Sequence, residues 1–175
     1  MAEVLKFTCS LCSELHEGLP DWGCDAPDYY RGIPDAERER RGRLNADLCI
    51  VDDEHFFIRG VLLVPIIGVE QSFGWGVWTT LSECNFHRYC DLWEVDDMSG
   101  ERPYFGWFSN QLPFYPDTRN LKVDVHLQPS GSRPLLRLQS ADHPLVADQR
   151  DGISWERAVA FAERLLHGDF EYSKG

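Results

Sequence analysis

Apolar and polar residues alternate in the middle of the chain, as they do in strands that bury one face. In residues 121–127 the apolar side chains all fall on one face: Leu121, Val123, Val125 and Leu127. Comparable stretches bounded by turn-forming residues occur elsewhere in the chain. They predict further strands over residues 48–51, 56–64, 73–81, 104–110 and 135–139.

Three other stretches have the signals of helices. Between residues 154 and 167 the apolar residues recur every three or four positions and form one stripe: Trp155, Ala158, Val159, Ala162, Leu165 and Leu166. Ser154 can cap the start of this helix, and Gly168 stands where a left-handed residue commonly ends one. Similar signals predict a helix over 83–93, capped by Ser82, and a short polar helix over 35–41.

Most of the predicted strands follow one another without an intervening helix. This order is typical of antiparallel sheets, because parallel strands need long crossover connections. We therefore expect an α+β fold, an antiparallel β-sheet with helices packed on one face. A length of 175 residues suits one hydrophobic core, so residues 1–175 are expected to form a single domain. Residues 1–30 are rich in turn formers and make a distinct N-terminal segment within it.

The charge of the chain argues against two classes of partner. Its formal net charge is −12, whereas nucleic-acid binding draws most of its affinity from basic groups. No stretch approaches the roughly 20 apolar residues that span a bilayer, and the N-terminus has no secretory signal pattern. We expect a cytoplasmic protein whose partner is another protein or a small molecule, with neither nucleic acid nor a membrane.

Cys9 and Cys12 form a Cys-x-x-Cys pair, which is half of a tetrahedral zinc site. Disulfides are rare in the cytosol, so the six cysteines are better interpreted as metal ligands, buried thiols or reactive groups. A second Cys-x-x-Cys pair is absent, and the other ligands must come singly. We expect a structural zinc bound by Cys9, Cys12, His16 and Cys49, with Cys24 and His55 as alternatives for the last two positions.

Two other interpretations concern chemistry. Cys9 and Cys12 could form a redox pair, although no strand–helix context of the thioredoxin type surrounds them. Asp142 and His143 could act together as a general base in a hydrolase, but the chain lacks a Gly-x-Ser-x-Gly nucleophile motif. The simpler interpretation is that Asp142 and His143 end a strand and fix a loop before Pro144.

Several sequence motifs, in their order and spacing, resemble those of one bacterial family, domain of unknown function 2199 (DUF2199). They are F-x-C-x-x-C-x-x-x-H-x-G-L-P (7–20), D-L-C-I-V-D (47–52), F-F-I-R-G (56–60), W-G-V-W-x-x-L-S-E-x-N-F (75–86), Y-P-D-T (115–118) and D-H-P-L (142–145). The resemblance implies a one-domain bacterial protein and no particular activity. Ser13 departs from the expected pattern, in which glycine follows the second cysteine.

The sequence favours a non-enzymatic function. The Cys and His residues suggest a closed structural metal site, and no convincing catalytic group is visible. We therefore expect a small cytosolic binding or regulatory domain with one structural zinc. The hydrolase that uses Asp142 and His143, and the Cys9–Cys12 redox sensor, remain as alternatives.

Overall fold

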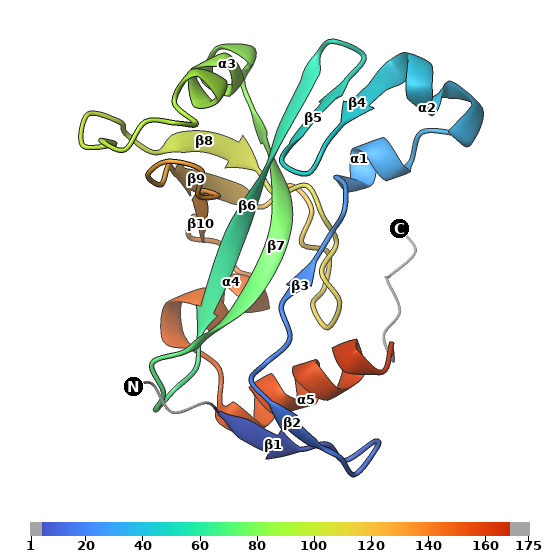
Figure 1. The fold of residues 1–175 in the computed structure, drawn as a ribbon, viewed down its shortest axis with the longest axis vertical. Coiled ribbons are helices and arrows are strands. Elements are labelled where there is room, and N and C mark those ends of the chain that lie inside the picture. The colour runs from blue at the N-terminus through green and yellow to red at the C-terminus, as the bar shows by residue number, and fades with distance from the viewer. Residues whose placement is uncertain (1–4, 169–175) are drawn as a thin grey trace.

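A long antiparallel hairpin forms the centre of the fold (Figure 1). Its strands are β6 (His55–Pro65) and β7 (Ser72–Leu81), paired in register from Phe56 opposite Leu81 to Pro65 opposite Ser72. The computed structural model describes residues 5–168 of the chain. It confirms an α+β architecture, and its sheet is mixed rather than purely antiparallel.

The sheet curls so that five of its strands close into a ring. After the hairpin come β8 (Tyr104–Trp107), β9 (Lys122–His126) and β10 (Leu135–Leu138), each antiparallel to the strand before it. A bridge between Thr79 and Phe108 joins the end of β8 to β7 in antiparallel fashion. Because five is an odd number, the ring must close with one parallel pair, which is β10 on β6, Leu135 opposite Val61.

Shorter strands extend the sheet outside this ring. The hairpin of β4 (Gly42–Leu44) and β5 (Leu48–Val51) pairs with the first half of β6, and β3 (Trp22–Gly23) runs parallel to β7. At Gly76 an added Cβ would lie 3.4 Å from the Cα atom of Gly23, so the close approach of β3 leaves little room for a side chain there.

The helices contribute to one main core inside the curled sheet. Residues of α3 (Glu83–Asp91), α4 (Pro144–Asp151) and α5 (Trp155–Leu166) all join it. Phe161 of α5 packs edge-on against Phe73, with ring centroids 5.8 Å apart. Ser82 and Ser154 accept hydrogen bonds from the backbone N–H groups of the first turns of α3 and α5, as the sequence predicts.

A second, smaller core lies on the opposite face of the hairpin. Phe57 and Trp78 point to that face, since neighbouring residues of a strand alternate, and they pack with other buried residues: Cys24, Ile33, Cys49 and Val51. The segment that carries α1 (Asp28–Arg31) and precedes α2 (Asp35–Arg41) covers this cluster. The sequence predicted helices on one face of the sheet only, whereas both faces of the hairpin are covered.

The first strands form a separate small sheet beside the last helix. β1 (Lys6–Thr8) and β2 (Leu15–Glu17) pair only with each other, and Figure 1 shows this hairpin next to α5, at the end of the molecule away from α3 and β5. Among the described residues no helix is both long enough and apolar enough to cross a bilayer.

Every predicted helix and strand is present, but six elements lie where none was predicted: β1, β2, β3, α1, β4 and α4. The helices predicted over 35–41, 83–93 and 154–167 and the six predicted strands are all present, with ends shifted by up to three residues. The loop expected at Asp142–Pro144 is instead the start of α4, because Pro144 occupies the first turn of the helix, where its missing N–H is not needed.

Candidate metal centre

A tight turn between β1 and β2 presents the two cysteines of the Cys-x-x-Cys pair. The N–H of Cys9 donates to the carbonyl oxygen of Glu14 at 2.8 Å, and the N–H of Ser13 donates to that of Cys9 at 2.8 Å. Ser13 has φ +63°, in the left-handed region that favours glycine. The turn therefore tolerates a side chain at the position where the sequence analysis expected glycine.

His16 is placed by its cross-strand neighbour. It lies on β2 directly opposite Phe7 of β1, and the two rings stack with centroids 5.3 Å apart. Phe7 is buried in the main core, so it anchors the small hairpin and the imidazole stacked on it. The Nε2 atom of His16 lies 3.4 Å from the Sγ atom of Cys12.

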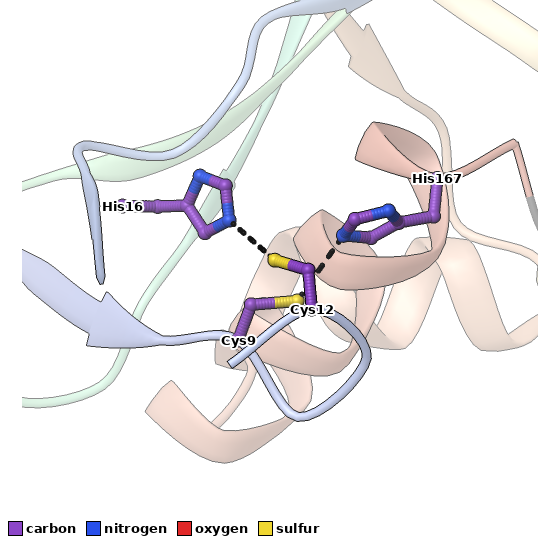
Figure 2. Close-up of side chains that lie close together, drawn as sticks. All are labelled: Cys9, Cys12, His16 and His167. Carbon is purple, nitrogen blue, oxygen red and sulfur yellow. Dashed lines mark hydrogen bonds between the residues drawn. The ribbon is translucent and has the colours of Figure 1, made fainter. Parts of the chain in front are cut away.

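The fourth member of the group comes from the other end of the described chain. His167 follows the last residue of α5, and its Nε2 atom lies 3.3 Å from the Sγ atom of Cys9. Figure 2 shows the two imidazoles approaching the pair of thiols from opposite sides. One ligand atom from each of Cys9, Cys12, His16 and His167 lies within 4.8 Å of every other.

A second contact holds the cysteine turn against α5. Glu163 accepts hydrogen bonds through Oε1 from the backbone N–H of Ser10, at 2.5 Å, and through Oε2 from the Ser10 hydroxyl, at 2.9 Å. The N–H of Leu11 points at the Sγ atom of Cys9, 3.4 Å away. An N–H directed at sulfur stabilises a thiolate, since it donates to the charged form.

The spacing of the four donor atoms suits a tetrahedral ion. Zinc binds sulfur at about 2.3 Å and nitrogen at about 2.0–2.1 Å, which places tetrahedral ligand atoms roughly 3.3–3.8 Å apart. The two closest sulfur–nitrogen distances, 3.3 and 3.4 Å, fall at the short end of that range. Two thiolates and two imidazoles can therefore hold a metal ion, and the two thiolate charges would balance a divalent ion.

The surroundings of the Cys12 thiol change its proton affinity. The pKa of Cys12 lies above its ordinary value: a backbone hydrogen bond with Glu14 lowers it, but burial and the neighbouring Cys9 thiol together outweigh that effect. Two thiolates so close repel each other, and a cation between them removes the repulsion.

The structure does not bring Cys49 to this group, although the sequence analysis named it as a ligand. Cys49 is fully buried on β5 in the second core, where burial raises the pKa of its thiol to about 12. Cys24 lies in the same cluster, and burial, aided by the nearby Asp28 carboxylate, raises its pKa to about 12. His55, at the start of β6, packs against the ring of Tyr29 at 4.7 Å.

The structure therefore brings together three of the predicted residues, Cys9, Cys12 and His16, and adds His167, which the sequence did not single out. His167 is 158 residues from Cys9, and the periodicity of α5 predicted only that it ends the helix. The sequence offered one hint of its position. His167 directly follows the apolar stripe of α5, so it had to lie at the edge of the surface that this helix packs against.

His143 has a structural role in the described chain. The Nδ1 atom of His143 accepts a hydrogen bond from the N–H of Leu145 at 3.1 Å and so caps α4. Asp142 is exposed at the surface. A neutral imidazole that accepts a hydrogen bond at Nδ1 carries its proton on Nε2, so it has no free lone pair to act as a base. The arrangement does not favour the hydrolase interpretation.

Comparison with known protein families agrees with the sequence motifs. The model of one family, described as uncharacterized protein conserved in bacteria (DUF2199), matches residues 8–153. The chain belongs to this family. The DUF2199 match includes Cys9, Cys12 and His16 and ends before His167. No curated protein and no solved structure matches the chain.

Proposed function

We propose that this DUF2199 protein is a small cytoplasmic binding or regulatory domain that holds one structural zinc ion through Cys9, Cys12, His16 and His167. The observation that carries the proposal is the convergence of these four donor atoms within 4.8 Å from two ends of the described chain. Residues 1–30 would be the zinc-binding segment of a single domain that covers residues 1–175.

Zinc is the metal that this donor set suits best. Thiolate sulfur and imidazole nitrogen are the ligands of structural zinc sites, whereas calcium and magnesium prefer oxygen. Four protein ligands also complete a tetrahedral shell and leave no position for a water or a substrate. A closed shell supports a structural role for the ion over a catalytic one.

The N-terminal segment needs such an ion for its stability. Between residues 5 and 23 only Phe7 and Cys9 are buried, so hydrophobic burial contributes little to its order. Ordering each residue costs roughly 1–2 kcal/mol of conformational free energy. Metal binding at a site that is absent from the unfolded chain adds directly to folding free energy and can offset that cost.

The test is metal analysis of the full-length chain, purified without chelators. We expect about one zinc per chain in the wild type and a large loss in Cys9→Ser and in His167→Ala. Cys84→Ser is the matched control, because Cys84 is exposed and lies on α3, away from the site. Replacement of zinc by cobalt should give the visible spectrum of a tetrahedral thiolate–imidazole site.

Two outcomes would overturn the proposal. If the wild type carries no transition metal and a Cys9–Cys12 disulfide forms readily, the pair is a redox site. If the His167→Ala protein retains its zinc with unchanged affinity, the fourth ligand lies elsewhere, and the closed shell argued here is wrong.

A further inference from the structure

A cavity lies between the β4–β5 turn and α3. Figure 1 shows α3 at the end of the molecule away from the β1–β2 hairpin that carries the candidate metal centre. Its volume is about 370 Å³. One wall is the turn, and the other is the C-terminal part of α3 with the residue just beyond it; the lining residues are Asn45, Ala46, Asp47, Leu48, Tyr89, Cys90 and Trp93. Cavities that bind small molecules begin at about 300 Å³, so this one suits a ligand of one or two rings.

Internal hydrogen bonds hold the turn wall in place. The side-chain oxygen of Asn45 accepts from the N–H groups of Asp47, at 2.9 Å, and Leu48, at 2.7 Å. The carboxylate of Asp47 accepts from Nε of Arg133 at 2.7 Å, and its backbone oxygen accepts from the N–H of Arg59 at 2.9 Å. The wall is therefore formed before any ligand arrives, which reduces the ordering cost of binding.

The helix wall presents two aromatic rings. Tyr89 and Trp93 are four residues apart and pack edge to face, with centroids 5.8 Å apart. Leu48 adds apolar surface to the turn wall and Cys90 to the helix wall. Aromatic rings prefer edge-to-face or offset partners, so a third ring can complete this arrangement.

Tyr89 carries an unused hydrogen-bonding group. Its side chain is 4% exposed, and its hydroxyl has no hydrogen-bond partner within the part of the chain that the structure describes. Burial, together with the negative charge of Asp47, raises the pKa of Tyr89, so the phenol stays protonated and remains a donor. A buried hydroxyl without a partner costs free energy. A ligand whose acceptor atom reaches the hydroxyl, by a small movement of the Tyr89 ring, would recover that cost.

We propose that this cavity binds a small uncharged aromatic molecule with a carbonyl oxygen that accepts a hydrogen bond from the Tyr89 hydroxyl. An uncharged ligand fits because Asp47, the charged residue of the lining, is already paired with Arg133. A charged ligand would lose its hydration against apolar walls without a free counter-charge. This inference is independent of the zinc site.

The experiment compares two probes of nearly the same shape. Acetophenone has a carbonyl oxygen, and α-methylstyrene has a methylene group in its place. Each is titrated into the ¹⁵N-labelled full-length chain, and binding is read from the backbone amides of Leu48 and Cys90 and the indole N–H of Trp93. We expect acetophenone to bind about fivefold more tightly, which is the size of one neutral hydrogen bond.

Two variants distinguish the contribution of the Tyr89 hydrogen bond from binding in the cavity itself. In Tyr89→Phe the preference for acetophenone should fall to about one, while α-methylstyrene binds as before. Ala46→Trp should block both probes, and because Ala46 is exposed this substitution spares the core. Absence of binding, equal binding of the two probes to the wild type, or a preference that survives Tyr89→Phe would overturn the proposal.

Discussion

The Nε2 atom of His167 lies 3.3 Å from the Sγ atom of Cys9, although 158 residues separate them in the chain. This contact joins the end of α5 to the turn after β1. Ser10, in the same turn, also donates two hydrogen bonds to the Glu163 carboxylate of α5. An ion bound by Cys9 and His167 would thus add a direct link between two parts of the fold that are far apart in the chain.

Removal of zinc by a strong chelator should loosen both of these parts and leave the central sheet folded. We expect hydrogen exchange to show lost protection in residues 7–17 and in the last turn of α5. Protection in β9 should persist, because Val123 and Val125 are fully buried in the main core. Equal loss of protection in β9 would mean that the metal supports the whole fold.

The substitutions Cys9→Ser and Cys49→Ser should affect different properties of the protein. Cys9→Ser should reduce zinc content and lower the melting temperature, because a site ligand is lost. Cys49→Ser should keep about one zinc per chain and lower the free energy of unfolding by roughly 1–3 kcal/mol, since it places a hydroxyl in an apolar cluster. Zinc content and urea unfolding measure the two effects; zinc loss in Cys49→Ser would return Cys49 to the ligand set.

Glu163→Gln should weaken zinc binding without abolishing it. The carboxylate accepts two hydrogen bonds from Ser10, which lies between the two cysteine ligands in the turn. Partners that orient metal ligands typically change metal affinity by about 10–100-fold, and we expect the low end because Ser10 is not itself a ligand. Competition with a fluorescent zinc chelator measures the zinc affinity of the variant and of the wild type. Glu156→Gln, on the first turn of the same helix, should leave affinity unchanged.

The free energy of unfolding should fall as pH rises through the range in which a buried thiol keeps its proton and an exposed thiol has lost it. Burial raises the pKa of Cys49 to about 12, from an ordinary value of 9.0. Between these values the unfolded thiol has lost its proton and the folded one has kept it, so higher pH favours unfolding. Urea unfolding at pH 8 and pH 10 should show this decline, and Cys49→Ala should make it shallower. A slope unaffected by Cys49→Ala would show that other groups cause it.

Most of the regular structure follows from local patterns in the sequence. Strand β9 was predictable because Val123 and Val125 alternate with polar neighbours, and α5 because its stripe begins at the capping residue Ser154. Helix α4 was not predicted, since Pro144 is as common in turns as in the first turn of a helix. The parallel pairing of β10 with β6 was also missed, because it depends on closure of the whole ring.

The residues of the candidate metal centre also divide into those that are close in sequence and one that is distant. The spacing of Cys9, Cys12 and His16 lies within one hairpin, so sequence alone could group them. His167 joins them only through the packing of α5, and no spacing rule reaches across that distance. Cys49 looked suitable because it stands on a rigid strand, but its side chain points into the second core and its thiol is enclosed there.

The distance between Cys9 and His167 along the chain has a consequence for how the protein is made. Cys9, Cys12 and His16 leave the ribosome early, whereas His167 leaves only after all the strands of the sheet have been synthesised. A nascent chain can thus offer three ligands for most of translation and four only when α5 has docked. Complete coordination would then mark a chain whose sheet and last helix are already in place.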